Sequence, residues 1–400
     1  MLPETQAGCD YDAVCAGHLC LDIIPSFPGQ REIDLGSLFR PGSLVRVGPA
    51  ELSCGGSVSN TGIGLVRLGL EVAFMALVGR DQFGGIAVEL LGRHGSTAGI
   101  RKTAEASTSY SVVISPPGAD RMFLHSPGAN DLFDSSHLDF DIIRRARHFH
   151  LGYPTVMRSL AERGGAELVE IFSRVKQLGL STSLDLSLQD SAAGQAYDWP
   201  GIFRRLLPHV DLLLPSLEES LQCLDPARYR KLTRQGGNLI GQIRTEEVRE
   251  LAEQFIGSGC GLCLIKAGAH GIYLKSSGRE RVALFGRGFR GEVGDWAGRE
   301  LWCPAFEIEA IASATGAGDV SISAFLAGML GCLPLERSLR LAALAGWLNL
   351  HSLDSTSAIP HLAECQRILD EDCPPAAIPG REFGRGWRHD KEASLLRFEE

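Results

Sequence analysis

The sequence lacks a hydrophobic run long enough to cross a bilayer. Its most apolar stretch, Val320 to Leu335, has 16 residues between Asp319 and Glu336, whereas a membrane-spanning helix needs about 20. The first residues, MLPETQAGCD, contain neither the basic segment nor the apolar core of a signal peptide. We therefore expect no association with a membrane and a cytoplasmic location.

The chain also has fewer positive than negative side chains. Lys and Arg number 39 against 48 Asp and Glu, which gives a net charge of −9, and the basic residues are scattered rather than clustered. A surface of this kind repels nucleic acid at long range, so we expect no nucleic-acid partner. A local site for an anion remains open, because backbone amides at a helix N-terminus bind phosphate without basic side chains.

Cysteines with metal-binding spacing are missing too. The chain has 11 cysteines, an odd number that favours reduced thiols. The Cys260-Gly-Leu-Cys263 pair has no second ligand pair spaced for zinc, so we interpret it as two buried strand residues. Hydrophobic residues at 44% and charged residues at 22% supply a core and argue against disorder. The 47 glycines show no collagen period, so they belong to turns and to close approaches of the backbone.

Two nucleotide-binding motifs are absent. No lysine follows a glycine anywhere in the chain, which excludes the P-loop motif G-x-x-x-x-G-K-[ST]. The glycine-rich turn at 314–319 also lacks the G-x-G-x-x-G fingerprint of dinucleotide-binding folds. This second absence argues against an oxidoreductase, a reading that detectable NAD(H) binding would revive.

Apolar runs alternate with amphipathic segments along most of the chain. Such alternation predicts βαβ units and a mainly parallel sheet covered on both faces. The expected strands are Tyr11–Leu21, Glu71–Val78, His148–Gly152, Ser181–Leu186, Val210–Leu214, Cys260–Lys266 and Gly271–Lys275. The expected helices are Val58–Leu68, Gly84–Gly95, Val156–Leu178, Glu247–Phe255, Val320–Leu330 and Leu335–Leu350.

Other segments break this alternation. Ile33–Ser53 and Thr108–His125 predict short strand pairs that form a small second sheet or lid. Pro226–Gln242 and Ser276–Arg299 are polar and rich in turn residues or arginine, so we expect surface loops or insertions. The end of the chain is irregular after Pro374, with a short helix expected at Glu392–Glu400.

The strongest motif is the turn Ala314-Thr-Gly-Ala-Gly-Asp319, which precedes an uncharged helical run. Small residues let the backbone approach a ligand, and the helix start directs free amides at the same place. These amides suit a phosphoryl group in transfer, and Asp319 in the first turn can take a proton from an attacking hydroxyl. The alternative is an ordinary helix start with an acidic first turn.

A second motif, Gly55-Gly56-Ser-Val-Ser-Asn60, precedes another helix. Paired glycines expose backbone amides, and Asn60 projects from the first turn, which is a pattern able to bind a polyol. A tight strand-to-helix turn with no ligand is the equally open alternative. The segment Gly79-Arg-Asp-Gln-Phe-Gly84 follows one βα unit later.

The order of these three motifs, GG-x-x-x-N, G-x-D-x-x-G and T-G-A-G-D, resembles the ribokinase family of sugar kinases, also called PfkB carbohydrate kinases. The resemblance covers about Tyr11 to Pro360. It implies a Rossmann-like three-layer α/β fold with a small inserted β lid over the sugar. It also implies transfer of the γ-phosphate of ATP to a hydroxyl group, with Mg²⁺.

The resemblance implies a role for several residues, matched position by position. Asp319 matches the family's catalytic base, and the amides of Gly316, Ala317 and Gly318 match its anion hole. The residues that match contacts to the sugar are Asp22, Gly55, Gly56 and Asn60. The residues that match the nucleotide side are Lys266, Gly268 and Gly271, and Glu219 matches the residue that organises the metal. Without the resemblance, Asp22 reads equally as a solvated turn residue and the Lys266–Gly271 turn as a plain hairpin.

Several positions depart from the family pattern. Ser313 and Ala314 stand where Asp and Thr usually precede the T-G-A-G-D motif, which puts activation by a monovalent cation in doubt. Ser216 and Ser187 each replace an Asn, and Ser216 suggests weaker metal affinity. Trp347 lies in a helix near the expected nucleotide, where we expect core packing rather than base stacking.

Two functions are compatible with this pattern. The first is an ATP-dependent carbohydrate kinase acting on a sugar, sugar-like or nucleoside substrate. The second is a pseudokinase that senses a sugar or nucleotide, which the serine replacements favour and the retained Asp319 disfavours. We expect residues 1–365 to form the kinase domain, with a lid from about 31–54 and 106–127, and residues 366–400 to form a C-terminal extension. Exposed lid strands predict a homodimer.

Overall fold

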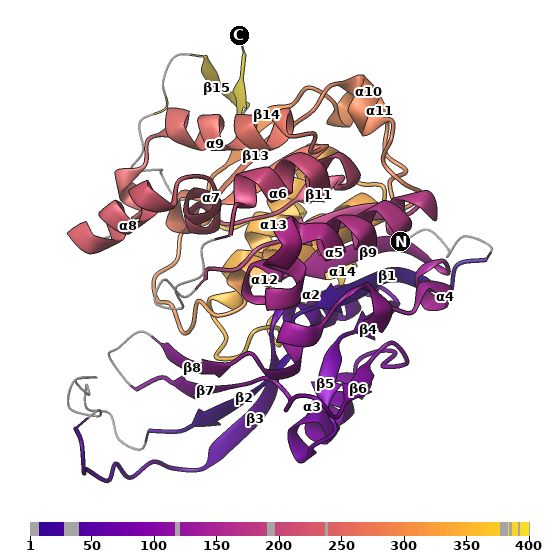
Figure 1. Cartoon of the computed structure of the whole chain (residues 1–400). Helices are drawn as coiled ribbons and strands as arrows, with labels where there is room; N and C mark the ends of the chain where they lie inside the picture. Colours follow the sequence, from indigo (N-terminus) through magenta and orange to yellow (C-terminus); the bar gives the residue numbers. More distant parts are fainter. Residues whose placement is uncertain are drawn as a thin grey trace.

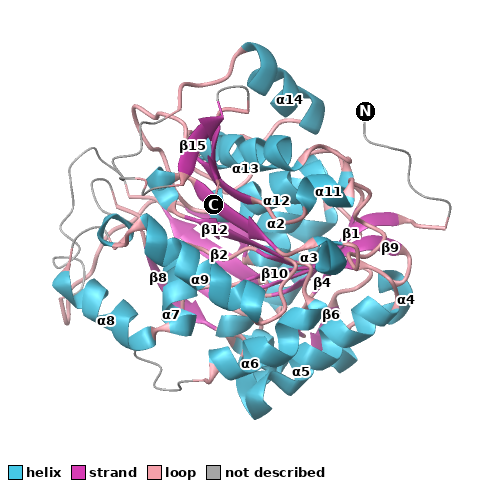
Figure 2. Cartoon of the chain, turned by 90° about the horizontal axis from the view of Figure 1, so that it is seen from above, coloured by secondary structure: helices cyan, strands magenta, loops and turns pink. Residues whose placement is uncertain are grey.

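The computed structural model describes residues 8–27, 40–116, 121–189, 197–236, 239–376, 383, 386–390 and 393–399. In this part of the chain the largest unit is a ten-stranded sheet with helices on both faces (Figures 1 and 2). Its parallel half runs in the order β4 (Val72–Met75), β1 (Tyr11–Gly17), β9 (Ala146–Gly152), β10 (Ser181–Asp185), β11 (Leu212–Leu213) and β12 (Leu262–Lys266). An antiparallel half continues with β13 (Ile272–Ser276), β14 (Glu300–Cys303), β16 (Leu395–Phe398) and β15 (Trp387–Asp390).

The central strands are buried along almost their whole length, as expected for strands covered on both faces. One layer of helices contains α2 (Ser57–Arg67), α10 (Arg279–Val282), α11 (Val293–Trp296), α12 (Ala317–Leu330), α13 (Leu335–Asn349) and α14 (Leu362–Glu371) (Figure 2). The other layer contains α4 (Phe140–Ile143), α5 (Arg158–Gln177), α6 (Trp199–Leu206), α7 (Leu217–Leu224) and α9 (Thr245–Gly257). The predicted three-layer α/β fold with a mainly parallel sheet is therefore confirmed.

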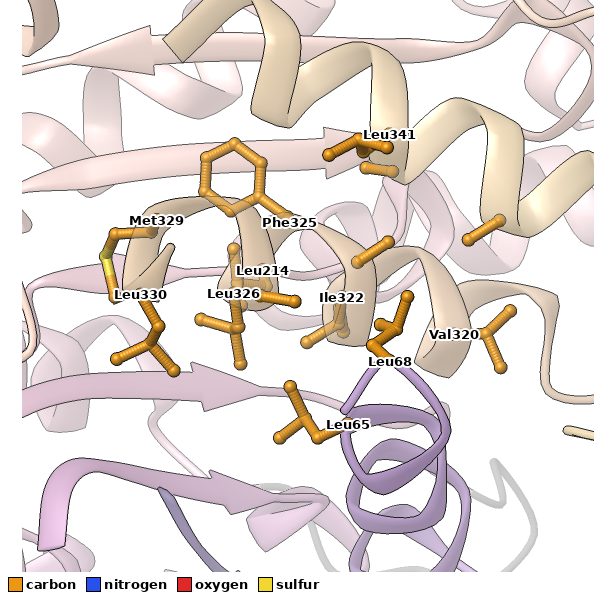
Figure 3. Packing of buried hydrophobic residues seen from close by; sticks show 14 of the residues in the cluster. Leu65, Leu68, Leu214, Val320, Ile322, Phe325, Leu326, Met329, Leu330 and Leu341 are labelled. Carbon is orange, nitrogen blue, oxygen red and sulfur yellow. The ribbon is translucent and has the colours of Figure 1, made fainter. Parts of the chain in front are cut away.

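Helix α12 lies in the interior, between the sheet, α2 and α13. Its aliphatic side chains meet Leu65 and Leu68 of α2, as Figure 3 shows. Close contact is possible because Gly64 has no side chain, and a Cβ there would collide with the Ser323 hydroxyl. The uncharged sequence of α12 thus has a packing reason, and its buried first turn is fixed against the first turn of α2.

A second sheet projects from the body (Figure 1). Its order is β3 (Ala50–Gly55), β2 (Cys20–Pro25), β7 (Tyr110–Ile114) and β8 (Met122–Ser126). The prediction of strand pairs agrees with β7 and β8, while residues 33–39 of the other predicted segment lie outside the described residues. A third, two-stranded sheet joins β5 (Leu77–Gly79) and β6 (Arg101–Thr103), and α3 (Gln82–Gly92) follows β5.

Several local predictions were wrong. The expected strand Tyr11–Leu21 is two strands, because Gly17 turns the chain at φ 118 where its Cα lies against the Gly152 carbonyl. Ser276–Arg299 is not a surface loop, since it forms α10 and α11 and buries Trp296. Pro226–Gln242 likewise contains a helix, α8 (Pro226–Gln235), which projects from the body (Figure 1).

The end of the chain also differs from the prediction. Instead of a helix at Glu392–Glu400, the strand β16 pairs with β14 and with β15. From Leu396 to Glu399 apolar and charged residues alternate, a pattern that fits a strand on a sheet edge. The boundary expected at residue 365 falls inside α14. Among the described helices, none has the length and hydropathy of a membrane span.

Candidate active site

The T-G-A-G-D motif forms the start of α12. Gly316 is the N-cap and adopts the left-handed conformation at φ 77, where a Cβ would meet Ser355 at 2.5 Å. Asp319 lies in the first turn and is only 4% exposed. The amides of Gly318 and Asp319 begin the helix and have no carbonyl one turn earlier in it to bond with. The motif therefore places these two amides next to a buried carboxylate, whereas the amide of Ala317, one of the three predicted to form the anion hole, donates to the Ala314 carbonyl at 3.3 Å.

Three donors surround the Asp319 carboxylate. Asn60 Nδ2 donates to Oδ2 at 2.9 Å, and Thr61 Oγ1 donates to Oδ1 at 3.5 Å. The Tyr153 hydroxyl lies 2.8 Å from Oδ1 and 2.9 Å from Oδ2. Burial raises the pKa of Asp319, whereas the Lys266 charge and these donors lower it. Asn60, which is predicted to contact a sugar, also joins α2 to the carboxylate.

Lys266 joins three elements at the same place. It ends β12, and its Nζ lies 2.9 Å from Oδ1 of Asp185 at the end of β10. A Cβ at Gly318 would lie 3.6 Å from the same Nζ, so the ammonium lies against the start of α12. Burial lowers the pKa of Lys266, but the charges of Asp185 and Glu219 outweigh this effect and the net direction is upward. The ammonium is thus held charged beside the first turn of α12.

Glu219 and Ser216 form a reciprocal cap at the start of α7. The Ser216 amide donates to Glu219 Oε2 at 2.6 Å, and the Glu219 amide donates to Ser216 Oγ at 3.2 Å. Burial raises the pKa of Glu219, and the Lys266 charge opposes this. The serine that replaces the family's Asn therefore caps the helix with its hydroxyl, while its backbone amide orients the carboxylate predicted to organise a metal.

A cavity of about 830 Å³ opens beside these groups, within the usual range for a small-molecule site. One end is lined by Tyr153, Asp185, Glu219, Lys266 and Asp319, and the other by Phe306, Ile308, Ile311, Ala343, Trp347 and Leu350. The predicted nucleotide residues Gly268 and Gly271 line it as well, from the turn between β12 and β13. That turn is therefore a hairpin and a cavity wall at the same time.

Trp347 packs against the hydrophobic core, as expected, and also lies on the cavity wall. Its Nε1 donates to the Glu307 carbonyl at 2.6 Å, and its ring meets Phe306 edge to face. The hydrogen bond fixes the indole in a partly exposed position, so an aromatic face remains available at the apolar end of the cavity.

The fit of a divalent cation rests on the carboxylates at the polar end. Asp185, Glu219 and Asp319 gather around one lysine, and carboxylate oxygens are the side-chain ligands that Mg²⁺ prefers. In the described part of the chain, however, no three or more His, Cys, Asp or Glu side chains converge as a ready-made metal cage. This arrangement suits Mg²⁺, which usually binds one or two carboxylates and takes its other ligands from water and phosphate.

The other residues predicted to contact a sugar lie together on the small sheet. Gly55 pairs with Cys20, and a Cβ at Gly55 would collide with the Asp22 carboxylate. Burial raises the pKa of Asp22, which also accepts a hydrogen bond from Cys20 Sγ at 3.3 Å. Gly56 caps α2 at φ 86, against His18. The sequence thus identified residues that meet where the small sheet joins the body.

Sequence reasoning missed two side chains at this site. Tyr153 follows β9, and His125 on β8 brings its Nε2 to 3.4 Å from Nε2 of His18. A signal for Tyr153 existed, because residues that follow the carboxyl end of a parallel strand face the ligand-binding edge of the sheet. No comparable signal marks His125, since its contact with His18 joins segments 107 residues apart.

Comparison with known proteins agrees with this geometry. The description "pfkB family carbohydrate kinase" belongs to the family model that matches residues 13–362. The chain belongs to the pfkB family of carbohydrate kinases. The predicted resemblance is thereby confirmed.

Relatives of known sequence include plant fructokinases. The chain is 26% identical to probable fructokinase-4 of Arabidopsis thaliana over 89% of its own length and 96% of that protein. It is 28% identical to probable fructokinase-6, chloroplastic, of the same plant, but that match spans 44% of the chain and only 43% of the relative.

Solved structures share the fold. An Arabidopsis thaliana ribokinase complexed with ribose and ATP superposes with a TM-score of 0.63 at 19% identity, covering 90% of this chain and 98% of the other. A Xylella fastidiosa fructokinase with bound ATP superposes with a TM-score of 0.65 at 19% identity, covering 90% and 99%. At these identities the likeness establishes the fold of this pfkB family member and leaves its substrate open.

Proposed function

We propose that this chain transfers the γ-phosphate of ATP to a hydroxyl group of a sugar or sugar-like substrate, a nucleoside included, with Asp319 as the base. The observation that carries the proposal is the buried Asp319 carboxylate beside the anion-binding start of α12, with the Lys266 ammonium against the same turn. The ATP complexes of the ribokinase and fructokinase named above support the choice of donor.

In this reaction Asp319 takes the proton of the acceptor hydroxyl as its oxygen attacks the γ-phosphorus. The bond from phosphorus to the bridging oxygen breaks, and ADP leaves with the electron pair. The amides of Gly318 and Asp319 and the Lys266 ammonium face the charge that develops on the transferring group. A bound Mg²⁺, held through Glu219 or Asp185, would neutralise phosphate charge.

The two ends of the cavity suit chemically different parts of the substrates. Its apolar end, with Trp347 and Phe306, suits the base of a nucleotide, and its charged end suits the phosphates. The acceptor then approaches Asp319 from the small sheet, where Asp22, Gly55 and Gly56 lie. Closure of this sheet over the acceptor would exclude water, which would otherwise take the phosphate.

The test is an ADP-release assay over a panel of sugars, sugar-like alcohols and nucleosides with ATP and Mg²⁺. We expect stimulated turnover with at least one acceptor, and its loss in Asp319→Asn. The matched control is Asp10→Asn, a change in a half-exposed carboxylate at the start of β1 that pairs with Arg145. Turnover that survives Asp319→Asn would refute the role of this residue, and the absence of any stimulated turnover would refute the kinase assignment.

The second candidate is a pseudokinase that senses a sugar or nucleotide. The observation that favours it is the use of Ser216 in the α7 cap, where the family has an Asn near the metal. Calorimetry separates the two functions, because a sensor binds sugar without binding ATP–Mg²⁺.

We also propose a homodimer through the small sheet, whose outer strands β3 and β8 carry exposed Leu52, Phe123 and Leu124. A monomer mass in solution scattering would refute it.

A further inference from the structure

Tyr153 has a backbone conformation that costs free energy. Its φ of 65 and ψ of 37 lie in the left-handed region, which a bulky side chain rarely adopts. Strain of this kind costs free energy and persists only where the surroundings fix it. Among the described residues, the other non-glycine positions with positive φ are Arg163, Cys332 and Ser394.

A backbone hydrogen bond holds Tyr153 in this conformation. Its amide donates to the Asp185 carbonyl at 3.1 Å, which ties the turn after β9 to the end of β10. Pro154 follows, and a residue before proline prefers an extended conformation, so the proline adds to the strain at Tyr153. The resulting turn directs the phenol at the first turn of α12 instead of along the sheet edge.

The phenol hydroxyl then lies within 2.9 Å of both oxygens of Asp319. Burial raises the pKa of Tyr153, and the charge of Asp319 raises it further. The hydroxyl therefore keeps its proton and can only donate to the carboxylate when Asp319 is ionised. Such a donor favours the charged form of the acid.

The charged groups around the Asp319 carboxylate affect whether it is ionised, so the Tyr153 donor matters. The charged groups around Asp319 are Lys266 from β12, Asp185 from β10 and Glu219 from α7, and the neutral donors are Asn60 and Thr61 from α2. Burial and the charge of Asp185 favour a neutral acid, while one lysine and three hydrogen-bond donors favour the ion, and the net direction of the Asp319 pKa is upward. A neutral Asp319 has no capacity to accept a proton from a substrate.

We propose that Tyr153 is a positioning residue for the phosphoryl transfer, which orients the Asp319 carboxylate through its hydroxyl and favours the ionised form of that carboxylate. The inference rests on the proposed function, because Tyr153 acts through Asp319. This role explains the strained backbone of Tyr153, because an unstrained turn after β9 would direct the side chain elsewhere. Nothing in the T-G-A-G-D motif specifies this partner.

The test compares Tyr153→Phe with the unaltered chain. The change removes one oxygen and keeps the ring that packs 5.9 Å from His18. We expect the acidic limb of kcat/KM against pH to move upward by about one unit, as a donor to a carboxylate is lost. At a pH below the limb kcat falls about tenfold, while KM for ATP stays within twofold.

The control variant is Tyr11→Phe, which removes a phenol hydroxyl at the start of β1 that is 3.4 Å from Ser96 Oγ. It should leave the pH profile unchanged. A purely structural role of Tyr153 would lower the melting temperature of Tyr153→Phe without moving the limb. An unmoved limb in Tyr153→Phe overturns the proposal.

A measurement without substrate separates this inference from the proposed function. The pKa of Asp319 is obtained from the difference in unfolding free energy between the chain and Asp319→Asn as pH varies. Repeating this pair in the Tyr153→Phe background should give a higher pKa. If this rise is seen while no acceptor supports turnover, the coupling holds and the kinase assignment fails. If turnover is normal and the pKa does not rise, the role of Tyr153 fails alone.

Discussion

Replacing Lys266 by methionine tests how the charged end of the cavity is held together. The ammonium lies 2.9 Å from Asp185, which at an effective dielectric of ~20 corresponds to a gross attraction of about 6 kcal/mol. Removing an ammonium from water costs several kcal/mol and offsets most of this gain. Loss of one partner from a buried pair typically costs about 3–5 kcal/mol, because the other charge stays buried alone. We expect Lys266→Met to lose stability in this range at pH 8.

The loss should depend on pH in a defined direction. Burial and the charges of Glu219 and Asp319 already hold the folded pKa of Asp185 well above its unfolded value, and loss of the Lys266 charge raises this pKa further. The folded state then binds a proton that the unfolded state has released, so stability falls as pH rises toward the folded pKa. The slope is up to about 1.4 kcal/mol per pH unit. The variant should therefore be closest to the unaltered chain near pH 5.

The assay is urea unfolding followed by circular dichroism at pH 5.5 and pH 8. The double variant Asp185→Asn/Lys266→Met should recover a large share of the stability, because it leaves no lone charge. Lys275→Met is the matched control, since Lys275 pairs with Glu300 at 2.8 Å but its side chain is 20% exposed. Equal stability of Lys266→Met and the unaltered chain at pH 8 would refute the reasoning. So would a double variant that is no more stable than the single one.

Three further changes have defined outcomes. Asp319→Asn removes the base and should lower kcat by about 10²–10⁴, measured as ADP release, while folding is retained by circular dichroism. Ser216→Asn restores the longer side chain beside Glu219 and should lower the Mg²⁺ concentration for half-maximal activity; an unchanged or higher concentration contradicts this. His150 is buried, and burial lowers its pKa to about 3. As pH falls below ~6.5, His150 is therefore protonated in the unfolded state but not in the folded state. The folded state loses stability over this range, down to the folded pKa. His150→Asn should therefore lose about 1.4 kcal/mol less stability than the unaltered chain between pH 7.5 and 5.5, by urea unfolding; an equal loss would count against it.

The sequence was sufficient for the layers of the fold and for the anion-binding turn. Alternation of apolar strands with amphipathic helices implies a covered parallel sheet, whatever the side chains are in detail. The turn at 316–319 needs only glycine, a helix start and one acid, all of which are local. Local patterns failed at the end of the chain, where β16 exists because β14 offers an edge to pair with. An edge strand takes its conformation from its neighbour as much as from its own residues.

The contacts within the candidate site could not be read from the sequence. Asn60 meets Asp319 across 259 residues, and Tyr153 meets it across 166. The Asn60 contact depends on the tight packing of α2 on α12 at Gly64, and the Tyr153 contact depends on the turn after β9. Such pairings follow from which strand ends and helix ends share one edge of the sheet, and this is a property of the assembled layers.

The sequence by itself thus determined the family, the α/β class and the residue types that phosphoryl transfer requires. The tertiary structure decided how those residues are charged and held. It placed Lys266 between Asp185 and the start of α12, and it gave Asp319 a phenol donor that no motif announces. The physical reason is that burial and neighbouring charges set a pKa, and both exist only after distant segments have packed together.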